Sequence, residues 1–171
     1  MIACFDVHYR SDFAQATAVL ITDWTATKPH RTYTIQAPLA GEYKPGQFYK
    51  RELPILKMLL TKIEESLTYL VVDSYVHLGL GKPGLGAYLY GSIEPRIPVI
   101  GVAKTHFRAA EGVEIPLLRG ESLKPLFITS VGCENIWAAG SIAEMAGPYR
   151  MPDMLKLADQ LSKAKIDSPE I

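Results

Sequence analysis

The sequence predicts one α/β domain, spanning residues 1–171, in which helices pack against a mixed β-sheet. Three observations predict this class: three consecutive strand-like segments near the start, two later segments that are almost wholly apolar, and helical patterns that separate or follow these two. Consecutive strands joined by short turns pair antiparallel, whereas wholly apolar strands are typical of parallel pairing between covering helices. We therefore expect an antiparallel meander of three strands followed by parallel strands.

The meander is expected at residues 1–9, 14–22 and 30–36. The first and third segments alternate apolar and polar residues, and the second is a continuous run of small and β-branched residues. Residues 37–48 then contain two prolines and two glycines, which predicts an exposed loop.

An amphipathic helix is expected after this loop, because leucine and isoleucine recur at spacings of three and four over residues 49–67. Pro54 is compatible with such a helix only in its first turn. The two apolar strands are expected at 69–73 and 98–102, and a glycine-rich loop and a crossover helix would connect them. The remaining expected elements are a strand at 123–130 and closing helices at 136–146 and 153–163.

Composition excludes several classes of protein. Hydrophobic residues make up 48% and charged residues 21% of the 171, which is typical of a globular domain and not of a disordered or fibrous chain. Lys plus Arg and Asp plus Glu both number 18, so no overall positive field holds a polyanion. A nucleic-acid partner would need a local basic patch or metal ions.

Location is predicted from the cysteines and from the apolar segments. Two cysteines, Cys4 and Cys133, cannot form the disulfide framework of a small secreted domain. Asp6, His8 and Arg10 interrupt the opening segment where a secretory signal would be apolar, and no segment approaches eighteen apolar residues. We therefore expect a cytoplasmic protein that does not enter a membrane.

Carboxylates at predicted strand ends are the first candidate site. Asp6 interrupts the apolar side of the first strand, Asp73 closes an apolar strand, and Glu52 begins the amphipathic helix. Adjacent strand ends form ligand crevices in open sheets, and carboxylates meeting there suit a hard cation such as Mg²⁺. The alternative is that Asp6 and Asp73 are turn or capping residues and that Glu52 favours a helix N-terminus.

Several short motifs resemble, in the same order, those of the endonuclease V family of ribonuclease H-like, metal-dependent nucleases. The segments that carry the resemblance are Asp6-Val7-His8-Tyr9, Tyr43-Lys44-Pro45-Gly46 with Arg51-Glu52, Leu70-Val71-Val72-Asp73, residues 98–104 ending in Lys104, Lys124-Pro125 with Ser130-Val131-Gly132, and Tyr149-Arg150-Met151-Pro152 with Ala158-Asp159. None is specific alone, but their common order is.

The resemblance implies hydrolysis of a phosphodiester bond near inosine or deoxyinosine in DNA or RNA, in repair or processing, with Mg²⁺ or Mn²⁺. Asp6 and Asp73 would hold the metal, and Glu52 would share it or orient the attacking water. Lys104 would stabilise the phosphate or the leaving oxygen. The alternative for Lys104 is a solvated residue after a buried strand.

The same resemblance predicts the nucleic-acid contacts. Tyr43, with Pro45 and Gly46, matches a loop that places an aromatic wedge in the strand, although an ordinary surface tyrosine is equally compatible with the pattern. In the loop after Asp73, Lys82 stands where the family has a histidine, and His77 is a candidate replacement or a surface residue. The base that is recognised is therefore open.

A fourth acidic metal ligand is expected where the last strand leads into a helix. This chain has Cys133 in place of the family's histidine, and Ala138 falls opposite the acid. Glu134 is the candidate replacement, with helix capping as its alternative. Because these positions differ, the second functional hypothesis is a nucleic-acid-binding homologue that does not cleave. A third is a small-ligand domain that uses the glycine-rich loop. We expect a monomer.

Overall fold

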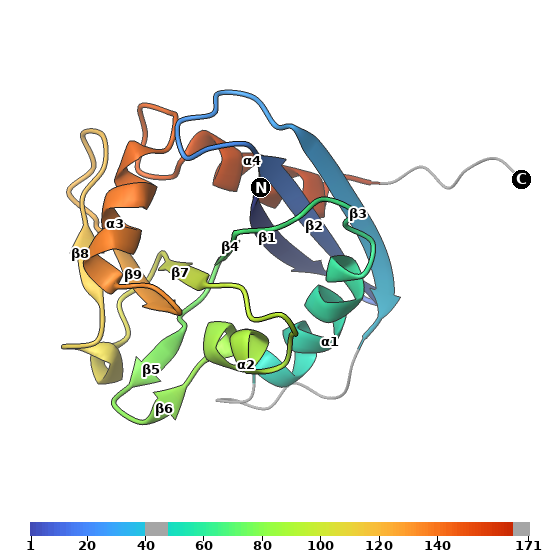
Figure 1. Cartoon of the computed structure of the whole chain (residues 1–171), viewed down its shortest axis with the longest axis horizontal. Coiled ribbons are helices and arrows are strands. Elements are labelled where there is room, and N and C mark those ends of the chain that lie inside the picture. Colours follow the sequence, from blue (N-terminus) through green and yellow to red (C-terminus); the bar gives the residue numbers. More distant parts are fainter. Residues whose placement is uncertain (40–47, 166–171) are drawn as a thin grey trace, which may run out of the picture.

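The computed structural model describes residues 1–39 and 48–165, and a seven-stranded mixed sheet is its main element (Figure 1). The strands lie in the order β3-β2-β1-β4-β7-β9-β8. Their bounds are β1 (Ile2–Tyr9), β2 (Phe13–Ile21), β3 (Arg31–Pro38), β4 (Tyr69–Val72), β7 (Val99–Ala103), β8 (Ile115–Leu117) and β9 (Leu126–Val131).

A two-stranded hairpin and four α-helices complete the described chain. The hairpin consists of β5 (His77–Gly79) and β6 (Lys82–Pro83), and a 3₁₀ turn covers Arg108–Ala110. The helices are α1 (Tyr49–Leu60), α2 (Leu85–Gly91), α3 (Asn135–Glu144) and α4 (Asp153–Lys163). In the residues described, no helix combines the length and apolar character needed to cross a bilayer.

The meander and the parallel strands are both confirmed. β1 pairs antiparallel with β2, and β2 with β3, through short turns. β4 pairs parallel with β1 and with β7, and the chain reaches these strands through α1 and α2. Parallel neighbours require such crossovers because the chain must return to the same edge of the sheet before each strand begins.

The edge beyond β7 contains a feature that the sequence did not predict. β9 runs antiparallel to β7, and the three-residue strand β8 pairs antiparallel with β9. The connection from β7 to β9 carries no α-helix that would return the chain across the sheet, so β9 runs back alongside β7. Its last residue, Val131, therefore pairs with Val99 at the start of β7.

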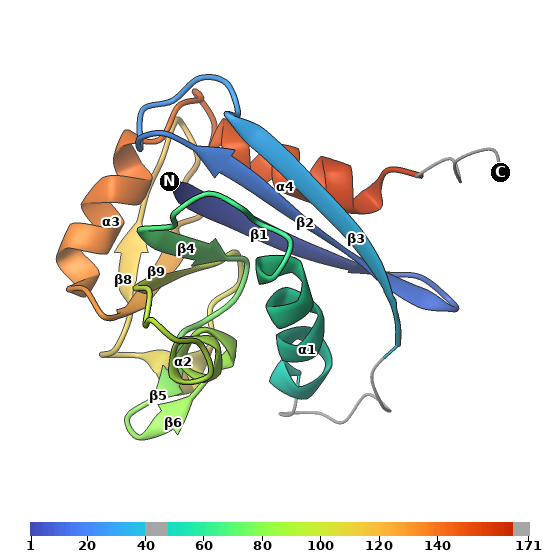
Figure 2. The ribbon, with the colours of Figure 1, turned by 45° about the vertical axis from the view of Figure 1, so that its right-hand side comes forward.

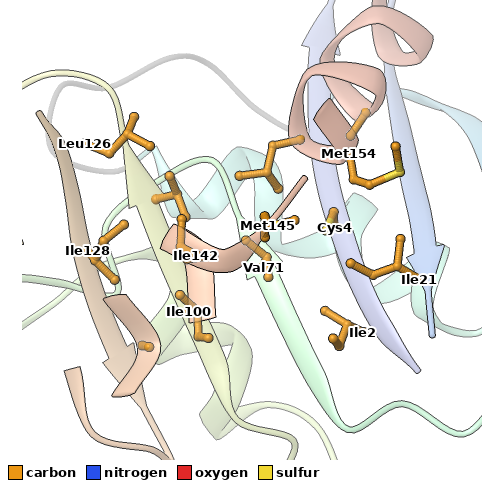
Figure 3. Close-up of a cluster of buried hydrophobic side chains, with 14 of the residues drawn as sticks. Ile2, Cys4, Ile21, Val71, Ile100, Leu126, Ile128, Ile142, Met145 and Met154 are labelled. Atoms are coloured by element: carbon orange, nitrogen blue, oxygen red, sulfur yellow. The ribbon is translucent and has the colours of Figure 1, made fainter. Parts of the chain in front are cut away.

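Each face of the sheet is covered by helices. α3 and α4 cover one face, where the core includes Cys4, Val71 and Ile100 (Figure 3). α1 and α2 cover the other, and Figure 2 shows α1 and α4 on opposite sides of β1 and β2. Residues 2–5 of β1 and residues 70–72 of β4 alternate between these two cores, which is why these stretches are wholly apolar.

Helix α1 differs from its prediction in the position of Pro54 and in the residue at which the helix ends. It begins at Tyr49 as expected, but Pro54 is its sixth residue and so lies beyond the first turn. Pro54 is exposed, so the ring lies away from the core that Ile55, Leu56 and Leu59 form. The helix ends at Leu60, although the apolar repeat continues to residue 67. Ile63 and Leu67, the later residues of the repeat, still pack against the core, but they do so from the non-helical segment that follows α1.

Candidate active site

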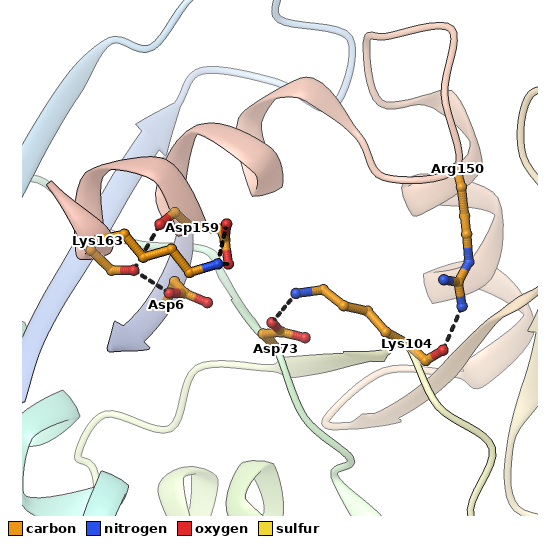
Figure 4. Close-up of polar contacts among 7 residues, drawn as sticks. Asp6, Asp73, Lys104, Arg150, Asp159 and Lys163 are labelled. Carbon is orange, nitrogen blue, oxygen red and sulfur yellow. Dashed lines mark hydrogen bonds and ion pairs between the residues drawn. The ribbon is translucent and has the colours of Figure 1, made fainter. Parts of the chain in front are cut away.

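The strands β1, β4 and β7 run parallel and bring the predicted residues Asp6, Asp73 and Lys104 together, although β1 continues past Asp6 to Tyr9. Phe5 pairs with Val72, and Val72 pairs with Gly101, so Asp6 and Asp73 follow neighbouring positions of β1 and β4. Lys104 directly follows β7 at the same edge. Figure 4 shows the side chains of Asp6, Asp73 and Lys104 at this edge beneath α4.

A cavity of about 130 Å³ joins two of these residues to α1. Asp6, Asp73 and Glu52 line it, and the rest of its wall is apolar. Glu52 is only 7% exposed, because it lies one turn before Leu56 on the face of α1 that packs against the sheet. The apolar residues of the wall are Phe5, Val7, Phe48, Leu56, Val72 and Leu85.

Two carboxylates in this cavity, those of Glu52 and Asp6, resist ionisation. Burial raises the pKa of Glu52 well above its ordinary value, and the negative charges of Asp6 and Asp73 raise it further. Burial likewise raises the pKa of Asp6; the hydroxyl of Ser162 opposes this shift, and the charges of Asp73 and Asp159 add to it. Carboxylates in this arrangement gain stability from a cation placed among them.

Lys104 supplies one positive charge at the edge of the cluster. Its Nζ lies 2.6 Å from Oδ2 of Asp73, and both side chains are about one-third exposed. Burial lowers the pKa of Lys104, but the bond to Asp73 and the nearby carboxylates outweigh it, so the pKa is raised and the lysine stays charged. Arg150 donates to the carbonyl of Lys104 and, at 2.7 Å, to that of Pro125, which fixes the end of β7.

Helix α4 adds two polar residues that the sequence analysis did not assign to the site. The hydroxyl of the fully buried Ser162 donates to the carboxylate of Asp6 and lies 2.9 Å from the carbonyl oxygen of Asp159. The side chain of Asp159 lies beside Asp6 (Figure 4) and is held by Lys163 at 2.7 Å. One sequence signal could have indicated this role. Ser162 is a polar residue on the apolar stripe of the helix predicted at 153–163, and it lies three residues after Asp159.

If Asp6 holds a divalent cation, removing the hydroxyl of Ser162 is expected to weaken the binding of that cation. A Ser162→Ala variant leaves the buried carboxylate without its donor, so the pKa of Asp6 rises further and its charged form becomes rarer. We expect Mn²⁺ to bind roughly tenfold more weakly, which corresponds to one pKa unit of lost stabilisation. Calorimetric titration with Mn²⁺ measures this, and Ser162→Thr is expected to restore most of the affinity. Equal affinity in all three proteins would contradict the role of the hydroxyl.

The structure does not bring Glu134 to the other carboxylates. Glu134 immediately precedes α3, three residues after the end of β9, and β9 ends beside the start of β7. Lys104 and Asp73 lie at the opposite ends of their strands, so the length of the sheet separates them from Glu134. No side-chain hydrogen bond caps α3 at Glu134 either.

The predicted nucleic-acid contacts divide between described and undescribed residues. Tyr43, Pro45 and Gly46 lie outside the described residues. His77 and Lys82 lie on the hairpin β5–β6, where His77 pairs with Pro83 and Lys82 with Gly79.

A second cavity, of about 210 Å³, lies beside this hairpin. Phe48 and Leu85 line both this cavity and the one that contains the carboxylates, so the two adjoin. Its other lining residues are Tyr49, Ser74, Leu78, Gly84 and Phe107. Aromatic side chains therefore form much of a pocket next to the carboxylates.

The loop that follows Asp73 is held firmly against β7 and β9. The backbone N–H of Val76 donates to Oγ1 of the buried Thr129 at 2.8 Å. A Cβ at Gly101 would lie 2.3 Å from the carbonyl oxygen of Ser74, so only glycine permits this approach. The loop thereby places Ser74 in the pocket and Asp73 in the cluster.

Adding one methyl group at Gly101 is expected to displace this loop. We expect Gly101→Ala to lower the free energy of unfolding by about 1–3 kcal/mol, the usual result of overpacking. Urea unfolding measures this effect. Gly140→Ala, at an exposed position of α3 where no atom lies within 4 Å of the added Cβ, is the control and should be neutral or slightly stabilising. A Gly101→Ala protein of normal stability would contradict the packing argument.

The donor set fits a hard divalent cation. Within residues 1–39 and 48–165, no three histidine, cysteine, aspartate or glutamate side chains stand close enough to enclose a metal, and Lys104 contacts Asp73. The oxygen donors of Asp6, Asp73 and Glu52 nevertheless share one cavity, and Mg²⁺ or Mn²⁺ prefers such donors to sulfur or imidazole.

Comparison with known proteins identifies relatives of this chain. The family model described as "Endonuclease V" matches residues 1–160. Endonuclease V of Pyrococcus abyssi is 31% identical over 170 residues, which are 99% of this chain and 82% of that protein.

Solved structures agree with this match. A crystal structure of Ciona intestinalis endonuclease V, bound to DNA that contains an inosine followed by a ribo-adenosine, aligns with a TM-score of 0.78 at 18% identity and covers 95% of this chain and 83% of that one. The Streptomyces avermitilis endonuclease V aligns with a TM-score of 0.75 at 24% identity, over 95% and 79%. The predicted ribonuclease H-like fold is thereby confirmed. The chain belongs to the endonuclease V family of nucleases.

Proposed function

We propose that this protein is a Mg²⁺- or Mn²⁺-dependent endonuclease that hydrolyses a phosphodiester bond near inosine or deoxyinosine in DNA or RNA. The observation that carries the proposal is the meeting of Asp6, Glu52 and Asp73 in one cavity beside Lys104. Membership of the family supports the reaction, and the inosine-containing DNA bound by the Ciona intestinalis protein supports the substrate. Nucleic-acid repair or processing, a cytoplasmic location and a monomeric state are further parts of the proposal.

The metal would be held by Asp6 and Asp73, with Glu52 sharing it or orienting the water. Asp159 takes the fourth acidic position in place of Glu134, because it is the carboxylate that α4 places beside Asp6. When bound, the metal lowers the pKa of a water molecule and neutralises charge on the phosphate.

The protein's own groups hold and orient the reacting atoms. The carboxylate of Glu52, with its raised pKa, accepts a proton more readily than an ordinary glutamate, and this suits it to draw a proton from the attacking water. Lys104 keeps its charge and lies at the exposed side of the cluster, where its Nζ can contact a phosphate oxygen. The apolar wall around Glu52 limits the access of bulk water to that carboxylate and so strengthens its interactions.

The pocket beside the hairpin is proposed to take the extruded base. Phe48, Tyr49 and Phe107 give it flat apolar surfaces on which a base can stack. His77 and Lys82 would contact the strand from the neighbouring hairpin, and Tyr43, Pro45 and Gly46 would contact it from the preceding loop.

The test is cleavage of end-labelled strands that carry one inosine, against matched strands without it, as DNA and as RNA. Each is incubated with Mg²⁺, with Mn²⁺ and with a chelator. We expect metal-dependent cleavage near inosine only. Cleavage that is insensitive to the chelator, or equal on the matched strands, would overturn the metal or the substrate respectively.

The second candidate function is a binding protein of the same family that does not cleave. The contact between Lys104 and Asp73 favours it, because the lysine occupies an oxygen that the metal would need. This candidate predicts tight binding to the inosine strand and no cleavage product even at high Mn²⁺ concentration. Cleavage of many strands by each protein molecule would eliminate it.

A further inference from the structure

A third cavity borders the carboxylates on the side of α4, away from α1. It measures about 280 Å³ and is lined by Lys104, Tyr149, Arg150, Met151, Lys156 and Asp159. Lys104 connects it to Asp73, and Asp159 connects it to Asp6 (Figure 4). The cavity thus borders the proposed reaction centre, and it shares no lining residue with the proposed base pocket.

The loop that forms one wall of this cavity is firmly braced. The guanidinium of the buried Arg119 donates to the carbonyls of Met145, Gly147, Tyr149 and Arg150. Arg150 in turn donates to the carbonyls of Lys104 and Pro125. The backbone of residues 145–150 is therefore positioned before any ligand arrives.

Tyr149 is 65% exposed on this braced loop. An aromatic ring on an ordered backbone can stack on a partner at little further cost in conformational entropy. It lines a cavity whose other lining residues are mostly charged.

Lys156 lies close to the ring of Tyr149. It lies in the first half of α4, and its Nζ is 5.7 Å from the centroid of the Tyr149 ring. The other cations of the cavity are engaged, since Lys104 contacts Asp73 and Arg150 contacts carbonyl groups. Among the described residues Lys156 has no carboxylate partner, so its charge is available to an anion.

An exposed aromatic ring with an available cation suits a nucleotide, whose base stacks and whose phosphate is negative. A strand with its base in the pocket near Phe107 must cross Asp6 and Asp73 to bring a phosphate to Lys104. Its next nucleotide then arrives at the cavity on the α4 side.

We propose that Tyr149 and Lys156 form a subsite for the nucleotide beyond the scissile phosphate, on the side away from the extruded base. Tyr149 stacks on the base of that nucleotide, and Lys156 contacts its phosphate. The inference rests on the proposed function. The subsite adds a second point of contact to that of the base pocket, so the strand is bound on both sides of the carboxylates.

The test compares two inosine strands by fluorescence anisotropy, with a chelator present so that neither is cut. After the cleavage position is mapped with the unsubstituted protein, one strand ends there and the other continues by two nucleotides. We expect the unsubstituted protein to bind the longer strand more tightly. Tyr149→Ala should lose roughly tenfold in affinity for the longer strand, the scale of one base stacked on an aromatic ring, and none for the shorter.

Two further comparisons separate stacking from charge. An abasic site at the added nucleotide should remove the same affinity from the unsubstituted protein and none from Tyr149→Ala. Lys156→Ala should reduce the salt dependence of binding by about one released ion. Leu123→Ala and Lys57→Ala, at exposed positions away from the cavity, are the controls and should leave both strands unaffected.

Two results would overturn the subsite: an equal loss of affinity for both strands in Tyr149→Ala, or equal affinity of the unsubstituted protein for the shorter and the longer strand. Neither result would affect the proposed function, which is supported separately by cleavage near inosine. Failure of the unsubstituted protein to bind or cut any inosine strand would overturn both.

Discussion

A Glu52→Gln variant is expected to unfold at a higher temperature than the unsubstituted protein at neutral pH and to lose at least roughly a hundredfold in cleavage rate. The stability gain follows from burial: the carboxylate is 7% exposed and faces two other carboxylates. Glutamine keeps the size and shape but carries no charge. The loss of cleavage follows because an amide neither accepts the proton of a water nor holds a metal as a carboxylate does.

The pH dependence of this difference has a definite sign. The pKa of Glu52 is about 4.5 in an unfolded chain and is raised in the folded protein, so the folded state retains the proton to higher pH. Below pH 4.5 both states are protonated and the ionisation of Glu52 has no effect on stability. As the pH rises above this value the folded state loses stability relative to the variant, until Glu52 is ionised in both states.

Thermal unfolding of both proteins between pH 4 and pH 8, without metal, measures this effect. We expect the two melting temperatures to diverge as the pH rises, and added Mg²⁺ to raise that of the unsubstituted protein more than that of the variant. Glu121→Gln, at an exposed position, is the control and should follow the unsubstituted protein. A Glu52→Gln protein that is less stable at every pH would contradict the description of Glu52 as a buried, destabilising charge.

Replacing Asp73 with asparagine is expected to lower cleavage by at least about 10²–10³-fold while leaving strand binding intact or stronger. Asparagine removes a negative oxygen from the proposed metal site. It also removes the charge that holds Nζ of Lys104 at 2.6 Å, so the lysine becomes available to a phosphate. Loss of a negative charge beside the strand further favours binding.

Gel-shift affinity with a chelator, measured beside cleavage with Mg²⁺, separates the two effects. Asp12→Asn, in the exposed turn between β1 and β2, makes the same change of charge away from the cluster and should leave both properties unchanged. A large loss of binding in Asp73→Asn would show that Asp73 supports the fold of the site more than its chemistry. Full cleavage would remove Asp73 from the mechanism.

The sequence predicted best what depends on neighbouring residues in the chain. Asp73 and Lys104 directly follow apolar strands, and Asp6 lies in β1 one residue beyond its pairing with β4, so the parallel pairing of these strands brings the three residues to one edge. The strand pattern alone had left open that the two aspartates were turn or capping residues, and the family resemblance favoured a shared site. The direction of β9 did not follow, because an apolar strand reads alike in both directions. Glu134 was expected at the site because the resemblance places a fourth acidic ligand after the last strand, but the antiparallel β9 ends at the other edge.

The contribution of α4 required knowledge of packing between distant segments. Ser162 and Asp6 are 156 residues apart in the chain, and no local pattern indicates that the hydroxyl of one meets the carboxylate of the other. The limits of α4 itself agreed with the prediction, because its apolar stripe is regular. The direction of the helix over the sheet decides which polar residue reaches Asp6, and that direction depends on the whole fold.

The C-terminal end of helix α4 is also held by residues from β2 and from the turn between β1 and β2. The side-chain amide of Gln15 donates to the carbonyls of Leu161 and Ala164, and Arg10 donates to those of Lys163 and Ala164. The two ends of the described chain are therefore fastened to each other, and Asp6 receives the hydroxyl of Ser162 only where α4 is docked on β1 and β2. A substitution at Arg10 or Gln15, which touch no carboxylate of the cluster, thus reaches Asp6 through the position of the helix.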